Sequence, residues 1–97
     1  VDTTFWFEAS AYAIRHPQPR QTRAAFSHWL MNHYARLIGA IHPQLRAVEC
    51  KRRAYTLLTL VLGGWVTHGH GSAIRGVGSV TEQRQLLVDA AMAIVTR

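Results

Sequence analysis

Apolar side chains recur every three or four residues near the start of the chain, which is the spacing of one face of an α-helix. The positions that carry this stripe are Phe5, Trp6, Ala9, Tyr12 and Ala13. Asp2 or Thr3 can cap the helix, which we expect to run to about Arg15. The segment His16-Pro17-Gln18-Pro19 ends it, because the residue before a proline is disfavoured in helical geometry.

The two prolines that end the first helix are also compatible with the first turn of a second one. Backbone N–H groups in a first turn have no intrahelical acceptor, so a proline there removes no hydrogen bond. The predicted second helix reaches about Ile41 and stops at His42-Pro43. Its apolar stripe consists of Phe26, Trp29, Leu30, His33, Leu37 and Ile41.

A third helix is predicted from about Leu45 to Thr67, and its two halves differ. The first half is polar, whereas the segment from Tyr55 to Val66 is apolar on nearly every side. A helix of that kind must be covered on more than one side. Gly63-Gly64 lies inside it at a cost of roughly 1 kcal/mol per glycine relative to alanine. Such glycines usually persist where another backbone packs closely or where the helix bends.

The last helix follows a glycine-rich loop at residues 69–78. Ser79 and Glu82 have the spacing of a capping box, which places the start of this helix at Ser79. The helix should run to about Thr96, with a stripe of small and aliphatic residues that permits close helix contacts. No strand-like alternation and no repeat is visible, so the sequence predicts an all-α bundle of about four helices in one domain, residues 1–97.

Charge and composition restrict the environment more than the activity. The formal net charge is +6, but the basic residues are scattered and only Lys51-Arg52-Arg53 forms a cluster, which is typical of a solvated helix face. The single cysteine, Cys50, favours a reducing, cytoplasmic location and the role of a small buried apolar residue. The longest apolar run, residues 54–66, is shorter than a membrane span, so we expect a soluble protein with no membrane partner.

Catalytic and metal-binding patterns are weak. The chain has five acidic residues, and no Ser/His/Asp or Cys/His set forms a local signature, so we expect no enzyme and no cofactor. His68 and His70 flank Gly69 and could chelate, but no carboxylate or thiol with ligand spacing accompanies them. We therefore expect no metal site, and His68 instead suits the carbonyl end of the helix.

The aromatic residues leave two alternatives open. In so small a domain they can fill the core, or they can line an apolar cavity between helices in which a few polar groups orient a ligand. For the second alternative the expected ligand-binding residues are Trp6, Tyr12, Trp29, His33, Tyr34 and Trp65. Aromatic rings together with positive charge favour a flat or amphipathic, anionic small molecule.

Two segments carry a family resemblance. The first runs from Phe7-Glu8-Ala9 through Ala11 to Ala13-Ile14-Arg15-His16-Pro17-Gln18-Pro19-Arg20, and the second is Leu57-Leu58-Thr59-Leu60-Val61-Leu62-Gly63-Gly64-Trp65. The order of these motifs, the glycine loop and the capped final helix resembles the C-terminal half of TetR-type transcriptional regulators. The resemblance implies that the last two helices pair with their counterparts in a second subunit as a four-helix interface. It also implies that the earlier helices enclose a small-molecule pocket.

The resemblance leads to a functional hypothesis. We expect a ligand-sensing and dimerisation domain of a bacterial regulator, most often a repressor released from DNA by its effector, with DNA contacted only through an N-terminal domain in a longer polypeptide. The alternative is a stand-alone helical interaction module without a ligand. The expected homodimer contacts are the aliphatic residues of the last two helices: Leu58, Leu62, Leu86, Leu87, Ala90, Ala91 and Ile94.

Overall fold

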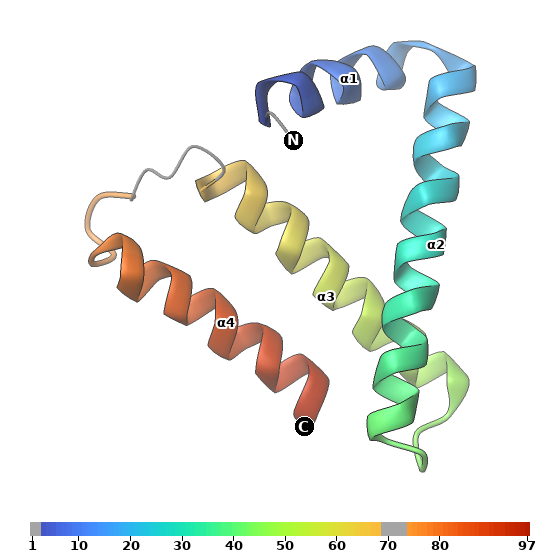
Figure 1. The fold of residues 1–97 in the computed structure, drawn as a ribbon, viewed down its shortest axis with the longest axis vertical. Helices are drawn as coiled ribbons and strands as arrows, with labels where there is room; N and C mark the ends of the chain where they lie inside the picture. Colours follow the sequence, from blue (N-terminus) through green and yellow to red (C-terminus); the bar gives the residue numbers. More distant parts are fainter. Residues whose placement is uncertain (1–2, 69–73) are drawn as a thin grey trace.

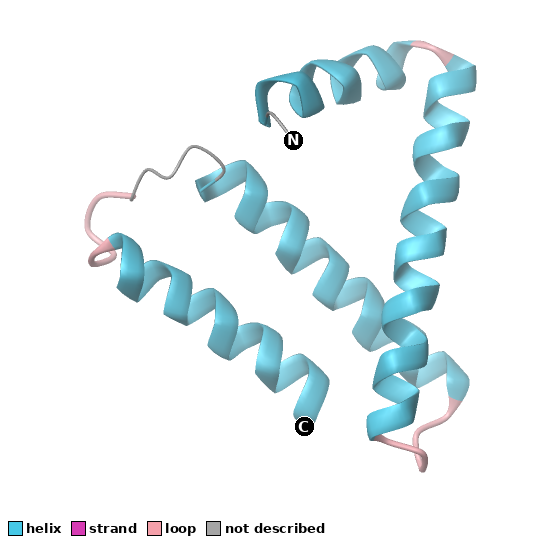
Figure 2. Ribbon diagram, viewed as in Figure 1, coloured by secondary structure: helices cyan, strands magenta, loops and turns pink. Residues whose placement is uncertain are grey.

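The structure is a computed structural model that describes residues 3–68 and 74–97, without the side chains at positions 3, 4, 6, 7, 66 and 68. The described part of the chain contains four α-helices and no strand, which confirms the predicted all-α fold (Figure 2). The helices are α1 (Thr3–Arg15), α2 (Pro17–Ile41), α3 (Ala47–His68) and α4 (Val80–Thr96). Of the two expected caps of α1, Asp2 lies outside the described residues and Thr3 is the first helical residue.

The corner between α1 and α2 forms as the two prolines predict. His16 has an extended backbone, Pro17 is the first residue of α2, and the N–H of Arg20 donates to the carbonyl oxygen of His16 at 3.1 Å. At the other end of α2 the N–H of His42 still donates to the carbonyl oxygen of Ile38, and Pro43 follows. Proline therefore fixes both ends of the longest helix.

The start of α3 was predicted two residues too early. Leu45 is not helical, because its N–H closes a turn by donating to the carbonyl oxygen of His42 at 3.0 Å. The carbonyl oxygen of Arg46 then accepts the first helical hydrogen bond, from Cys50. The turn places Leu45 against the core, so the residue that looked like the first apolar position of the helix packs from the loop instead.

The helices form a thin and open arrangement rather than a closed bundle. Figure 1 shows α2 and α3 meeting near the C-terminal end of α2 and diverging from there, with α1 extending from the far end of α2 and α4 lying beside α3. The molecule measures 41 × 40 × 18 Å, with a radius of gyration of 15.5 Å. A compact domain of this length has a radius of gyration of about 12.5 Å.

The core lies at the point where α2 meets α3. Ile38 is 1% exposed and packs on Cys50 and Ala54, which confirms the cysteine as a small buried apolar residue. Gly39 lies over the same point, since a Cβ atom built on it would be 3.6 Å from the sulfur of Cys50. Small residues therefore bring the two helices together while the rest of their length diverges.

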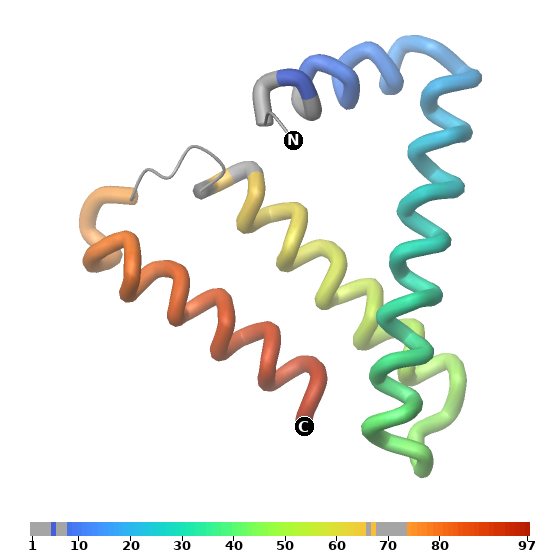
Figure 3. The backbone as a smooth tube through the Cα atoms, in the orientation of Figure 1, coloured from blue at the N-terminus to red at the C-terminus, as the bar shows by residue number. Residues whose placement is uncertain are grey.

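Helix α4 lies antiparallel to α3, as the tube in Figure 3 shows. A Cβ atom built on Gly64 would be 3.4 Å from the side chain of Leu87, so this glycine permits close packing against a side chain rather than a backbone. Gly63 has no such neighbour, because a Cβ atom there would meet nothing within 4 Å among the described residues. Among the described residues, Gly64 therefore has a packing partner at its Cβ position and Gly63 has none.

The N-terminal end of α4 combines a predicted cap with an unpredicted one. The capping box is confirmed: Glu82 N–H donates to the hydroxyl of Ser79, and Ser79 N–H donates to the Glu82 carboxylate. Beneath it Gln83 is only 3% exposed. Its side-chain amide donates to the carbonyl oxygens of Ile74 and Gly78, and its amide oxygen accepts from the N–H of Ile74. One glutamine thus fixes the end of the loop against the helix.

Replacement of Gln83 should measure this attachment. Gln83→Ala should lower the free energy of unfolding by about 1–3 kcal/mol, because it leaves half-buried backbone groups of Ile74 and Gly78 without partners. Gln85→Ala is the matched control, since Gln85 is exposed and bonds only Asp89 among the described residues; it should cost less than about 0.5 kcal/mol. Urea unfolding gives both values, and equal losses would contradict the role of Gln83.

Candidate functional site: an apolar cleft between α2 and α3

The divergence of α2 and α3 leaves an apolar cleft with a volume of about 580 Å³. One wall comes from the N-terminal half of α2 and the other from the C-terminal half of α3. The lining residues are Thr22, Arg23, Phe26, Ser27, Leu30, Tyr34, Leu58, Val61, Leu62 and Trp65. The volume falls within the roughly 300–1,000 Å³ that small-molecule sites occupy.

Helical periodicity explains why these residues share the cleft. On α2 the lining positions 23, 27, 30 and 34 recur every three or four residues, so they form one face of the helix. On α3 the positions 58, 61, 62 and 65 do the same. The polar members Arg23 and Ser27 lie off the apolar stripe of the sequence, which is why hydrophobic periodicity missed them. Their spacing from Leu30 was the signal that could have found them.

A second hollow of about 420 Å³ adjoins the cleft at the corner between α1 and α2. It is lined by Ala9, Tyr12, Ala13, Pro19, Thr22 and Arg23. Thr22 and Arg23 line both spaces, so they form the partition between them. The ring of Tyr12 stacks on that of His16 at a centroid distance of 3.9 Å, which holds it at the rim of this hollow.

The structure brings together only some of the expected ligand-binding residues. Tyr34 and Trp65 line the cleft from its two walls, and Tyr12 lines the neighbouring hollow. Trp29 and His33 line neither space; their rings stack on each other at 5.8 Å on the exposed surface of α2. The side chain of Trp6 lies outside the described residues.

Most of the aromatic side chains that the structure describes lie on the surface and fill no core. Trp29 is 58% exposed, and Phe26 stacks on it from the next turn, with ring centroids 6.0 Å apart. Tyr55 and Trp65 on α3 are also exposed, whereas Tyr34 is half-buried beside the Ile38 core. Of the apolar stripe predicted on α2, the described residues partly cover Leu30 and leave the other members exposed, including Leu37 and Ile41 beside Ile38.

The residues expected at a dimer interface divide into three groups. Leu58 and Leu62 line the cleft, and Leu58 is buried. Leu87, Ala91 and Ile94 are half-buried, at the spacing of the α4 face that packs on α3. Leu86 and Ala90 are exposed.

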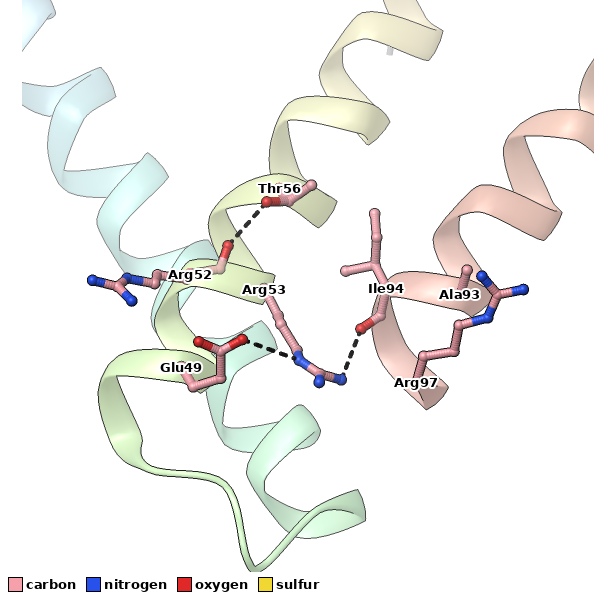
Figure 4. Close-up of a pocket in the computed structure, with 7 residues that line it drawn as sticks. All are labelled: Glu49, Arg52, Arg53, Thr56, Ala93, Ile94 and Arg97. Carbon is pink, nitrogen blue, oxygen red and sulfur yellow. Dashed lines mark hydrogen bonds and ion pairs between the residues drawn. The ribbon is translucent and has the colours of Figure 1, made fainter.

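A third hollow lies between the start of α3 and the end of α4, where side chains hold the two helices together (Figure 4). The guanidinium of Arg53 contacts the Glu49 carboxylate at 3.7 Å and donates to the carbonyl oxygen of Ile94 at 3.4 Å. From the loop after α2, Nε2 of His42 donates to the carbonyl oxygen of Val95 at 2.7 Å. These bonds satisfy carbonyl groups at the negative end of the α4 dipole, so we assign this hollow a structural role.

Metal binding can be assessed only for the part of the chain that the structure describes. The described residues contain no set of three His, Cys, Asp or Glu side chains placed to hold a metal ion. The candidate chelating pair falls outside them, since the His68 side chain and all of His70 are not described. No helix in the described ranges combines the length and hydrophobicity needed to cross a membrane.

No protein-family model matches the sequence, and no curated protein or solved structure matches it.

Paired substitutions on α2 test this assignment of exposed and buried positions. Trp29→Ala should lower the free energy of unfolding by less than about 1 kcal/mol, because the ring is largely in solvent and leaves no closed cavity. Ile38→Ala, about two and a half turns further along, should cost about 2–5 kcal/mol, because it leaves a cavity in the core that joins α2 to α3 among the described residues. Chemical denaturation of both variants measures which substitution lowers the free energy of unfolding more. A larger decrease for Trp29→Ala would contradict the exposed position of the Trp29 ring.

Proposed function

We propose that this chain is the small-molecule-sensing and dimerisation domain of a bacterial transcriptional regulator of the TetR type, with DNA contacted through a helix-turn-helix N-terminal to it. The observation that carries the proposal is the apolar cleft between α2 and α3. It is a preformed space of ligand size, with hydroxyl groups and one guanidinium among apolar walls. That composition is typical of sites that bind small organic molecules by burial and orient them by a few polar contacts.

The surface of the chain supports association with a second copy. Its accessible surface is 7140 Å², whereas a compact monomer of 10.9 kDa exposes about 5,600 Å². Part of the excess is apolar, and Leu86 on α4 is 57% exposed. A monomer would leave this apolar surface exposed to solvent, whereas a homodimer would bury it.

One face of the α3–α4 pair suits that contact. Thr56 and Ala93 flank the same hollow between the two helices, and helical periodicity places Gly63, Leu86 and Ala90 on the same side. We call these five residues the α3–α4 face. Its side chains are small apart from Leu86, so the helices of a second copy can approach closely and bury Gly63, where a Cβ atom would meet no described residue within 4 Å. This face would build the four-helix interface that the sequence resemblance implies.

Ligand binding and pairing would then share one helix. Helix α3 forms a wall of the cleft with Leu58 and Trp65 and contributes Thr56 and Gly63 to the α3–α4 face. A ligand that binds one angle between α2 and α3 better than another would shift the population of that angle. Because α1 is attached to the far end of α2, the shift would move α1 and the DNA-binding segment ahead of it.

Filling the cleft tests the sensing function. The uncharged fluorophore N-phenylnaphthylamine should bind the wild-type chain with enhanced fluorescence, and Leu30→Trp should weaken this binding roughly tenfold or more, because the added ring occupies the cleft. Leu37→Trp is the control, since Leu37 is exposed on the same helix outside the cleft, and it should bind the fluorophore as the wild type does. Binding that is unaffected by Leu30→Trp would overturn the site.

A charge on the α3–α4 face tests the homodimer. Ala90→Arg should convert a dimer into monomers at micromolar concentration, because a two-fold interface places the substituted residue near its symmetry mate and the charge counts twice. Gln85→Arg puts the same charge on another exposed face of α4 and should leave the dimer intact. Sedimentation velocity measures both, and a folded wild-type monomer at tens of micromolar would refute the proposed pairing.

A stand-alone interaction module is the second candidate, favoured by the exposed ring stack of Phe26, Trp29 and His33 on α2. Such a module would use this surface for a partner and would not need the cleft. The sensor therefore requires the cleft that Leu30 lines, whereas the interaction module requires the exposed ring of Trp29. Loss of function on filling the cleft supports the sensor, whereas loss on replacing the exposed Trp29 alone supports the module.

A further inference from the structure

We infer that the cleft between α2 and α3 takes an amphipathic organic anion, with its acidic group held by Arg23 and its apolar body directed toward Leu30 and Tyr34. The inference rests on the proposed sensing function and adds the chemical class of the ligand. It follows from which charges line the cleft, where the charged residue lies, and how long the apolar walls are.

The charge of the lining is one-sided. Among the described residues that line the cleft, Arg23 alone carries a formal charge. A cationic ligand would meet like charge in an apolar surrounding, which screens poorly. An anion would instead form charge-assisted hydrogen bonds, and the planar guanidinium presents two parallel N–H donors to a carboxylate or sulfonate. The net charge of +6 adds a long-range attraction of the same sign.

The position of Arg23 orients the ligand. Arg23 and Thr22 separate the cleft from the hollow beside Tyr12, so the polar end of the site lies at the α1 corner. The Thr22 hydroxyl donates to the carbonyl oxygen of Gln18 at 3.2 Å, whereas Arg23 supplies the one formal charge among the described lining residues. From Arg23 the lining of α2 continues to Tyr34 through Phe26, Ser27 and Leu30, so only one hydroxyl interrupts the apolar wall.

The dimensions limit the apolar body. Residues 23 and 34 are eleven positions apart on one helix, a distance of roughly 16 Å at 1.5 Å per residue. A volume of about 580 Å³ along that length accommodates two or three fused rings or a medium-length alkyl chain. Phe26 and Trp65 face such a body from opposite walls, and both aromatic and aliphatic surfaces gain by contact with their rings.

A pair of probes isolates the charge. Anilinonaphthalene sulfonate and N-phenylnaphthylamine share the same rings, and only the first carries a sulfonate. Arg23→Gln should raise the Kd of the sulfonate roughly tenfold and leave that of the uncharged amine within about twofold. Arg20→Gln is the matched control, because Arg20 is exposed one turn away and lines neither hollow; it should change neither Kd. Arg23→Lys should fall between Arg23→Gln and the wild type.

Competition then defines the body of the ligand. Decanoate and naphthoate should displace the sulfonate probe more strongly than decanol. Stronger displacement by decanoate would indicate an extended apolar body, and stronger displacement by naphthoate a flat one. Equal effects of Arg23→Gln on both probes, or no effect on either, would overturn the assignment of an anion while leaving the cleft as a binding site. Failure of both probes to bind the wild type would instead refute the sensing function itself.

Discussion

The contact of Ile38 with Cys50 and Ala54 is the constraint on which the other features depend. It joins α2 to α3 near one end of α2, where small residues let the helices approach. Because the helices cross there at an angle, their remaining length diverges, and the side chains that line the gap leave a cleft of about 580 Å³. The cleft is therefore a consequence of where the crossing lies.

Helix α4 is attached mainly at its ends. At its start Gln83 binds the loop at Ile74 and Gly78, and at its finish Arg53 and His42 donate to the last carbonyl groups. Between these points Leu87 packs over Gly64. Hydrogen bonds of this kind contribute about 1 kcal/mol each, so they fix the orientation of α4 more than they stabilise the fold. The orientation matters because it keeps Ala90 and Ala93 level with Thr56 on one surface.

Much of the architecture could be predicted from local features of the sequence. Proline at both ends of α2, the glycines before α4 and the pair Ser79 and Glu82 set the helix limits, because each acts through the neighbouring backbone. Cys50 was expected to be a buried apolar residue, which the structure confirms. The predicted start of α3 was wrong by two residues, because the N–H of Leu45 closes a turn with the carbonyl oxygen of His42 and the helix begins only after it.

The candidate site could be predicted less well, for a physical reason. Periodicity shows which face of a helix is apolar, but not whether another element covers it. The sequence placed both Trp29 and Tyr34 among the expected ligand-binding residues, yet of the two only Tyr34 lines the cleft against α3. The sequence analysis missed three side chains that fix α4, namely Arg53, His42 and Gln83. Each bonds to backbone atoms of a loop or of a segment distant in sequence, and no sequence motif of side chains indicates such a partner.

The open crossing also determines how a ligand could act on a distant part of the protein. The two walls of the cleft meet in one small core around Ile38, and α2 continues through a prolyl corner into α1. On its other side α3 contacts α4 where Leu87 packs over Gly64 and where Arg53 donates to the carbonyl oxygen of Ile94. An occupant of the cleft that changed the angle between α2 and α3 would therefore move α1 relative to the α3–α4 pair. Because α1 is attached at the end of α2 far from the Ile38 core, a small change of that angle would displace the α1 corner, where Arg23 lies, more than the part of α2 near the core.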